Sequence, residues 1–304
     1  MGARACPTVY PGPMASHLVP EGACRLLDRY ALDVFSVLPT LSSVRSARRA
    51  GRLLVDGEKV SSSHRVAPGS VLTLVQLPTR KPFPMELVVH HVDDHVAVVY
   101  KPAGIRTKGY AFRTLERAVP YNLPTSPLED GLEHPHCVHR LDMRVQGLVL
   151  VARTARADAA LGWACAERRV HKTYEAIVIG RLEGEGEVSE PVQERSAHTL
   201  WRALSHVRSL EAGWLTRVAV TPQTGRRHQI RRHLAHMGHP ILGDDLYTEG
   251  LVLRGRGLYL AAVELGLKHP VEPGRINVRS EAPPRFEVEM KRAARRWAKW
   301  NSDA

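Results

Sequence analysis

One carboxylic acid in this chain, Asp142, lies between two arginines, Arg140 and Arg144. The short apolar run 148–152 that follows Gly147 predicts a buried strand, so we expect Asp142 in the loop that leads into it. Nearby positive charge favours the ionised form of a carboxyl group, and an ionised carboxylate can act as a nucleophile or as a base. The residues alone leave a second interpretation open, in which Asp142 forms a surface ion pair or caps a turn.

The overall composition indicates a folded and strongly basic protein. The chain has 304 residues, of which 43% are hydrophobic and 24% are charged, which is enough for a sizeable core and two domains. Lysine and arginine number 43 against 31 aspartates and glutamates, for a net charge of +12. This excess favours a polyanionic partner, namely RNA, DNA or an anionic membrane, although a basic enzyme without such a partner has the same composition.

Cysteine usage and hydropathy favour an intracellular protein. The 4 cysteines are widely spaced and include no CxxC pair, which fits a reducing compartment better than a disulfide framework. No apolar run approaches the length of a membrane span, and the N-terminus lacks the apolar core of a secretory signal. We expect the cytoplasm, with the nucleus and an organelle as alternatives.

Two groups of histidines raise the question of a metal site. Zinc ligands recur at spacings such as HxxxH or CxxC, which place them on one face of an element. His228 and His233 lack this spacing, and Pro135 interrupts the other group. We therefore expect no metal ion, and we expect the histidines to bond backbone carbonyls or phosphates. The two groups are His134, His136, Cys137 and His139, and His228, His233, His236 and His239.

The first third of the chain contains a small unit at residues 23–77, in which two helices precede a hairpin and a strand. The serines at 42–43 predict the start of the second helix, which Gly51 ends. Asp56-Gly57 between two β runs is a strong hairpin signal. The second helix carries several arginines, which could grip phosphates or could form a solvated face.

The remaining chain alternates strand and helix signals. We expect five parts: a flexible tail at 1–22, the small unit at 23–77, a proline-containing linker at 78–84, a large domain at 85–290 and a basic C-terminal helix at 291–304. In the large domain we expect a loop at 120–136, short antiparallel strands within 181–213, helices at 155–169 and 229–236, and strands at 87–89, 96–100, 148–152, 172–179, 214–220, 258–267 and 286–290.

Several motifs occur in the order found in the RluA-type RNA pseudouridine synthases, and the chain resembles that family over residues 85–290. They are VVYKPAGI at 98–105, HRLDMRVQGLVLVART at 139–154, KTYEAIVIG at 172–180, TGRRHQIRRHLAHMGHPILGDDLY at 224–247 and LKHPV at 267–271. The small unit resembles an S4 domain, an RNA-binding module, through SSVRSARRAGRLLVDGEKV at 42–60 and VAPGSVLTL at 66–74. The resemblance implies an α+β fold with a mixed, mostly antiparallel sheet.

The resemblance also implies a reaction, the isomerisation of selected uridines in rRNA or tRNA without a cofactor. It assigns catalysis to Asp142 with Tyr174 and Arg231. The tyrosine ring can stack on uracil and its hydroxyl can act as a base, and Arg231 is expected to pair with Asp142. The alternatives are a core position for Tyr174 and a phosphate contact for Arg231. Arg140 is expected to hold the target nucleotide out of the stack.

Further RNA contacts are expected in both parts of the chain. For Lys101 a surface position at a turn is the alternative. One departure concerns Val145-Gln146, where relatives often carry Thr-Ser, which puts local hydrogen bonding and substrate preference in doubt. The candidate RNA-binding residues besides Arg140 are Lys101, His139, Arg226, His228 and Gln229 in the large domain, and Arg45, Arg48 and Arg49 in the small unit.

Two other functions compete with an RNA-modifying isomerase. One is an RNA-binding protein of the same fold that has lost turnover and acts in RNA folding or ribosome assembly. The other is a metal-dependent hydrolase built on the histidines. We expect a monomer that binds RNA and neither a metal ion nor a membrane.

Overall fold

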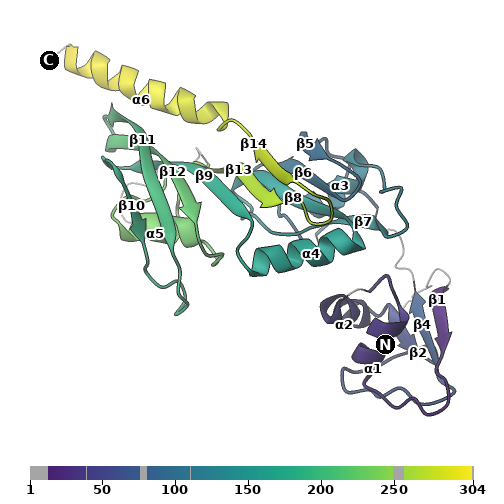
Figure 1. The fold of residues 1–304 in the computed structure, drawn as a ribbon. Coiled ribbons are helices and arrows are strands. Elements are labelled where there is room, and N and C mark those ends of the chain that lie inside the picture. The colour runs from purple at the N-terminus through teal and green to yellow at the C-terminus, as the bar shows by residue number, and fades with distance from the viewer. Residues whose placement is uncertain (1–12, 39, 76–80, 110, 249–256, 303–304) are drawn as a thin grey trace, which may run out of the picture. The chain divides into compact units, whose positions relative to one another are not determined.

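The computed structural model describes residues 13–38, 40–75, 81–109, 111–248 and 257–302. The chain divides into two compact units, Met1–Pro82 and Phe83–Ala304 (Figure 1). No helix in the described ranges is long and apolar enough to cross a bilayer.

The N-terminal unit packs two helices against a sheet of four strands. A single apolar core, which includes Leu27, Val44, Leu53 and Leu72, joins the helices to the sheet. The sheet order is β1-β4-β2-β3. The elements are β1 (Pro13–Leu18), α1 (Leu27–Val34), α2 (Leu41–Arg49), β2 (Leu53–Val55), β3 (Glu58–Lys59) and β4 (Val71–Val75).

Local sequence explains how these elements begin and end. Thr40, rather than the predicted serine pair, caps α2 in a capping box with Ser43. Asp56 and Gly57 both have positive φ, 50° and 82°, as a tight hairpin turn requires. The predicted hairpin is confirmed, whereas the predicted tail is wrong over β1, which pairs antiparallel with β4. Residues 1–12 lie outside the described ranges.

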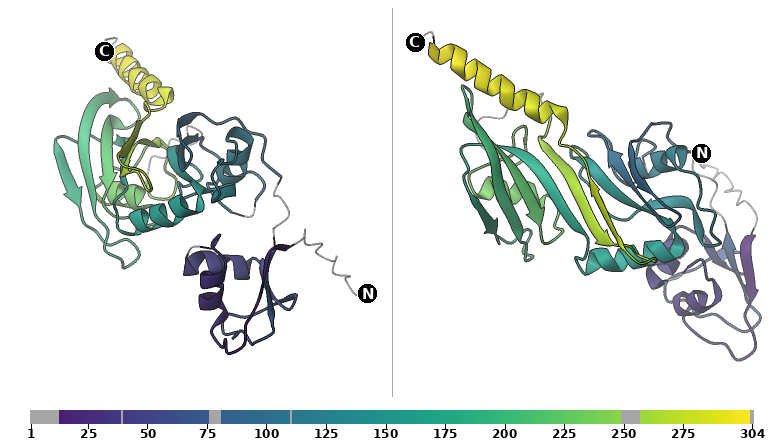
Figure 2. Two further views of the ribbon diagram at one scale, coloured as in Figure 1. Left: turned by 45° about the vertical axis from the view of Figure 1, so that its right-hand side comes forward. Right: turned by 45° about the horizontal axis from the view of Figure 1, so that its top comes forward.

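The second unit is built on a mixed sheet of 10 strands, in the order β10-β11-β12-β9-β13-β8-β6-β5, with β14 on β13 and β7 on β8 (Figures 1 and 2). Neighbouring strands are antiparallel except β13 and β8, which are parallel. The strands are β5 (Val89–Val92), β6 (Val96–Lys101), β7 (Gly131–Cys137), β8 (Gln146–Thr154), β9 (His171–Ile179), β10 (Glu185–Val188), β11 (Thr199–Ser209), β12 (Gly213–Pro222), β13 (Leu260–Lys268) and β14 (Arg275–Arg279).

Helices cover both faces of this sheet. Thr154 caps α4 as predicted, and α4 packs with Val96 and Val98 of β6 on one face. The alternate residues Ala97 and Val99 face the other core, to which α3, α5 and α6 contribute. The helices are α3 (Leu115–Asn122), α4 (Ala155–Ala166), α5 (Gln229–His236) and α6 (Pro284–Ser302).

Two predicted elements differ from the structure. Residues 286–290 form part of α6 rather than a strand, because Phe286, Met290 and Ala293 recur at helical spacing and lie buried on one side. The C-terminal helix therefore begins at Pro284, before residue 291. The region predicted as a loop, 120–136, contains the end of α3 and most of β7.

The sheet has two antiparallel parts, β10-β11-β12-β9-β13 and β8-β6-β5, which meet where β13 runs parallel to β8. Only two residue pairs define this register, Gln146 with Ala261 and Gly147 with Ala262. Gly147 has a φ of 124°, and a Cβ atom there would lie 2.2 Å from the Ala262 carbonyl oxygen. We call this the β8–β13 seam, and its close approach requires glycine at 147.

Replacing Gly147 with alanine should therefore lower the free energy of unfolding by more than about 1 kcal/mol, through strain and overpacking against the backbone of β13. Gly162→Ala is the matched control, because Gly162 is helical and, beyond its chain neighbours and the backbone of its own helix, no atom lies within 4 Å of its missing Cβ. That change should stabilise by up to about 1 kcal/mol. Urea unfolding followed by tryptophan fluorescence measures both, since all 5 tryptophans belong to the second unit. Equal stability of the two variants would contradict the packing argument.

Candidate active site

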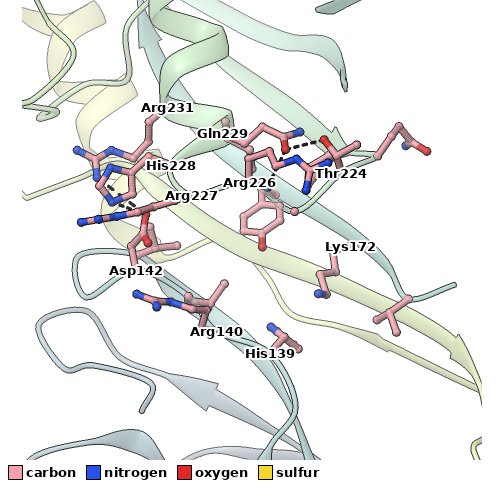
Figure 3. A pocket seen from close by; sticks show the side chains of 18 of the residues that line it. His139, Arg140, Asp142, Lys172, Thr224, Arg226, Arg227, His228, Gln229 and Arg231 are labelled. Atoms are coloured by element: carbon pink, nitrogen blue, oxygen red, sulfur yellow. Dashed lines mark hydrogen bonds and ion pairs between the residues drawn. The ribbon is translucent and has the colours of Figure 1, made fainter. Parts of the chain in front are cut away.

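A cleft of about 510 Å³ opens beside the β8–β13 seam. Five segments line it: the loop before β8, the end of α4, the start of β9, the turn between β12 and α5, and the first residue of β13. Figure 3 shows the side chains that these segments bring together from distant parts of the sequence.

Asp142 lies in the loop that leads into β8, as predicted, and its carboxylate faces the start of α5 (Figure 3). The Oδ2 atom lies 3.5 Å from Nε2 of His228 and 3.9 Å from Nη1 of Arg231. The flanking Arg144 is directed elsewhere, since it pairs with Asp245 and donates to the Gly243 carbonyl. The cationic surroundings of Asp142 therefore come chiefly from α5 rather than from its sequence neighbour Arg144.

Arg231 has Asp244 as its main partner. Its Nε and Nη2 atoms each donate to one carboxylate oxygen at 2.6 Å, and both side chains are buried. Burial alone would raise the pKa of Asp244, but hydrogen bonds from Arg231 and from the Leu246 N–H outweigh it and keep that pKa low. Arg231 lies near Asp142, as predicted, but as an electrostatic support whose guanidinium Asp244 holds in place.

Tyr174 on β9 lines the cleft and also packs against the main core, so both predicted interpretations apply to it. Burial raises the pKa of its phenol, and the negative charge of Asp142 raises it further. The hydroxyl is therefore protonated in the empty cleft at neutral pH. This environment suits ring stacking and hydrogen-bond donation, and it opposes a phenolate base in the resting site.

Lys101 is fully buried beneath the loop that carries Asp142. Its ammonium group donates to the carbonyls of Val145 at 2.7 Å, Pro102 at 2.9 Å and Met143 at 3.3 Å. The surface alternative is therefore wrong, and in place of the predicted RNA contact Lys101 supports the loop that carries Asp142. Burial lowers the pKa of Lys101 to about 8, although Asp142 opposes this shift.

This pKa sets a testable pH dependence. The folded pKa of Lys101 lies below the ordinary value of 10.5, so between those two values the unfolded chain binds more protons and stability rises with pH. The difference in free energy of unfolding, wild type minus Lys101→Met, should therefore increase from about pH 7.5 to about pH 10. Urea unfolding followed by tryptophan fluorescence gives both values. A pH-independent difference would show that the ammonium keeps its ordinary pKa.

His139 and Gln229 serve the protein framework rather than the open face of the cleft. His139 is largely buried, burial lowers its pKa well below the ordinary value, and its Nε2 accepts from the Leu150 N–H at 3.1 Å. The Gln229 side chain is buried too, and it accepts from Thr224 Oγ1 at 2.6 Å. Both residues line the cleft and have bonds that fix the loops around it. The bonds of the buried Gln229 oppose its predicted use on RNA, whereas Nδ1 of His139 has no hydrogen-bond partner among the described residues, and its RNA contact stays a prediction.

Arg226 and Arg140, both predicted to bind RNA, differ in exposure. Arg226 is half-buried and donates to the Ser196 carbonyl at 3.0 Å, whereas Arg140 is exposed at the cleft. Arg227, which the sequence did not single out, is also exposed there. Arg140 and Arg227 are thus cations at the cleft that solvent, and hence an incoming RNA, can reach.

Other site residues were missed as well. Asp244 and Tyr247 lie inside the motif at 224–247. The sequence alone does not show which carboxylate of that motif binds Arg231. Lys172 precedes Tyr174 by two residues on a strand, and this alternation could have placed both on the cleft side. Burial lowers the pKa of Lys172.

The departure at Val145-Gln146 has a structural explanation. Val145 packs in the main core and touches the cleft, so an apolar side chain is accommodated there. With its amide oxygen turned toward Arg285, Gln146 accepts from Nη2 at 3.0 Å and from Nε at 3.1 Å. Its bulk is therefore directed to α6 and not into the cleft.

The histidines mostly bond groups of the protein. His233 contacts Thr199 Oγ1 at 2.9 Å and the Glu190 carbonyl at 2.8 Å, and His239 contacts the Ile179 carbonyl at 3.1 Å. Among the residues that the structure describes, no group of three or more histidine, cysteine or acidic side chains is arranged to hold a metal ion.

Comparison with known proteins agrees with this fold and cleft. A family described as RNA pseudouridylate synthase matches residues 95–236. Ribosomal large subunit pseudouridine synthase D of Xylella fastidiosa is 31% identical, over 87% of this chain and 87% of that protein. The dual-specificity RNA pseudouridine synthase RluA of Pasteurella multocida is 34% identical, over 66% of this chain and 94% of that protein. The chain belongs to the RluA-type RNA pseudouridine synthase family.

A solved structure shows the same fold. Human RNA Pseudouridylate Synthase Domain Containing 1 aligns with a TM-score of 0.54 at 23% identity, over 68% of this chain and 86% of that one. The expected mixed and mostly antiparallel architecture is confirmed.

Proposed function

We propose that the protein converts specific uridines of structured RNA, in rRNA or tRNA, to pseudouridine, with Asp142 as the catalytic residue. The observation that carries the proposal is the position of Asp142 in the family's fold, inside a cleft that it shares with Tyr174 and Arg231. The names of the relatives, a large-subunit enzyme and a dual-specificity enzyme, support an RNA substrate.

The proposed reaction is balanced without a cofactor. The N1–C1′ bond of uridine breaks, the uracil turns, and a C5–C1′ bond forms. C5 then loses its proton and N1 gains one. Cleavage leaves C1′ electron-poor, so a carboxylate beside the sugar can attack it or stabilise it. Tyr174 supplies a ring for stacking, and the exposed Arg140 is placed to fill the space that the extruded nucleotide leaves.

The N-terminal unit is proposed to be an S4-like RNA-binding domain. On α2, Arg45 and Arg49 are exposed to solvent, where phosphates can reach them, although Arg45 also pairs with Asp28 at 3.4 Å. Arg48 is not, because its side chain is mostly buried and its Nε donates to Asp28 at 2.8 Å. The prediction that all three arginines contact RNA is therefore reduced to two.

This distinction predicts different effects of neighbouring substitutions. Arg49→Ala should weaken RNA binding and lower the slope of log affinity against log salt by about 1, because one phosphate contact is lost. Arg48→Ala should instead speed amide hydrogen exchange in α1 and α2, because Asp28 loses its buried partner. RNA-binding titrations at several salt concentrations measure the slope, and amide hydrogen exchange measures the local opening of α1 and α2. A reduced slope for Arg48→Ala, with normal exchange, would reverse the assignment.

Mapping pseudouridines in cells that lack the protein tests the function. Loss of one or a few pseudouridines, restored by the wild-type gene and not by an Asp142→Asn gene, is the expected result. Restoration by both would favour the RNA-binding protein without turnover. No lost pseudouridine together with metal-dependent hydrolysis by the purified protein would favour the hydrolase. The proposal takes the protein to be a monomer that needs no metal ion and no membrane.

A further inference from the structure

His228 occupies an unusual position at the entrance to α5. Its φ of 56° lies in the left-handed region, which histidine tolerates better than most residues. The side chain is only 13% exposed and lies beside Asp142 (Figure 3), and it also contacts Tyr247. The Nε2 atom is 3.5 Å from Asp142 Oδ2, and the Nδ1 atom is 2.8 Å from the Tyr247 hydroxyl.

Two polar neighbours share the Tyr247 hydroxyl. Arg232 Nε donates to its oxygen at 3.2 Å and Nδ1 of His228 lies 2.8 Å away, so a hydroxyl that donates to Nδ1 satisfies both contacts. A neutral imidazole that accepts at Nδ1 carries its hydrogen on Nε2. Nε2, which carries the hydrogen in this tautomer, is the ring nitrogen near Asp142, 3.5 Å from Oδ2.

Burial is the main reason that the His228 ring is neutral. Burial lowers its pKa, the positive charges of Arg231 and Arg227 lower it further, and the carboxylates of Asp142 and Asp244 oppose them. The net shift is downward, so the imidazole is uncharged at neutral pH. The Tyr247 ring, edge-on to the imidazole at 5.7 Å between centroids, completes its surroundings.

Arg231 does not donate a hydrogen bond to Asp142. Two of its nitrogens bind Asp244, and the third lies 3.9 Å from Asp142, beyond hydrogen-bonding distance. An uncharged donor orients a carboxylate without neutralising it, whereas a direct guanidinium pair would reduce its reactivity. At 3.5 Å from Asp142 Oδ2, His228 Nε2 lies nearer to the carboxylate than Arg231 Nη1 does.

We propose that His228 is the positioning residue of Asp142, which it orients through one neutral N–H, and that Tyr247 fixes the tautomer that makes this possible. The proposal rests on the proposed function and deepens it. It replaces the sequence-based expectation that His228 binds RNA.

Three variants test the proposal in steady-state assays of pseudouridine formation. His228→Ala should lower kcat by about 10- to 100-fold with KM changed by less than about threefold, since the donor acts on chemistry rather than on binding. His228→Gln keeps an N–H donor and meets the same left-handed backbone. Its kcat should be at least about tenfold higher than that of His228→Ala. Tyr247→Phe, which keeps the ring beneath Arg231 and Arg232, should fall between them.

The pH profile provides a readout that a structural role would not change. Protonated His228 carries a hydrogen on Nδ1 as well, so its bond to Tyr247 reverses direction, and its positive charge neutralises Asp142. Wild-type kcat should therefore fall on the acid side. The His228→Gln profile should lack that ionisation. The proposal is overturned if Ala and Gln are equally impaired, if only KM changes, or if the acid limb is unchanged in His228→Gln. If wild type forms no pseudouridine, or Asp142→Asn retains activity, the proposed function itself fails.

Discussion

Asp142→Asn should abolish pseudouridine formation while RNA binding stays within about threefold of wild type. The amide keeps the shape of the carboxylate and its neighbours but removes the charge that attacks or stabilises C1′. Removal of the reacting group in enzymes of this kind typically costs about 10⁴-fold or more in kcat. Chromatography of nucleosides from digested RNA measures the product, and a filter-binding titration measures affinity.

Asp94→Asn is the matched control, since Asp94 is an exposed aspartate of the same unit that lies outside the cleft. It should leave both measurements unchanged. Retention of more than about a tenth of wild-type kcat by Asp142→Asn would remove Asp142 from the chemistry. Loss of RNA binding in the same variant would instead make it a binding residue.

The second large effect concerns stability. Asp244→Ala should lower the free energy of unfolding of the second unit by about 3 to 5 kcal/mol, because it leaves the buried guanidinium of Arg231 without its bidentate partner. Activity should fall with it, since the freed Arg231 can then pair directly with Asp142. Urea unfolding monitored by tryptophan fluorescence isolates the second unit, which contains every tryptophan.

The adjacent residue offers a sharp comparison. Asp245 pairs with Arg144, but its side chain is 53% exposed, so Asp245→Ala should cost about 0 to 1 kcal/mol. Similar losses for the two variants would mean that burial does not distinguish the two ion pairs.

The sequence predicted those parts of the fold that depend on local chemistry. The Asp56-Gly57 hairpin, the Thr154 cap and the helix after Gly225 all follow from residues that lie next to the elements they define. The location of Asp142 in a loop before a buried strand belongs to the same class. Motif order then identified the family, which no single motif could do.

The predictions that were wrong or missing concern residues whose positions depend on long-range packing. Lys101 precedes a proline and a glycine in a turn-like context, yet the loop that carries Asp142 folds over it and buries its ammonium. Likewise, the choice of Arg231 between two carboxylates depends on the path of the chain after α5. Short apolar runs such as 286–290 fit a strand or a helix equally well, and only the packing of α6 separates them.

The β8–β13 seam has a consequence for truncated versions of the protein. Strand β13 lies between β9, which carries Tyr174, and β8, which follows the Asp142 loop, but it comes from residues 260–268. A chain cut to the family-matched residues 95–236 would hold all the proposed catalytic side chains and still lack the strand that connects their supports. Such a fragment should be inactive and prone to aggregate through its two uncovered strand edges.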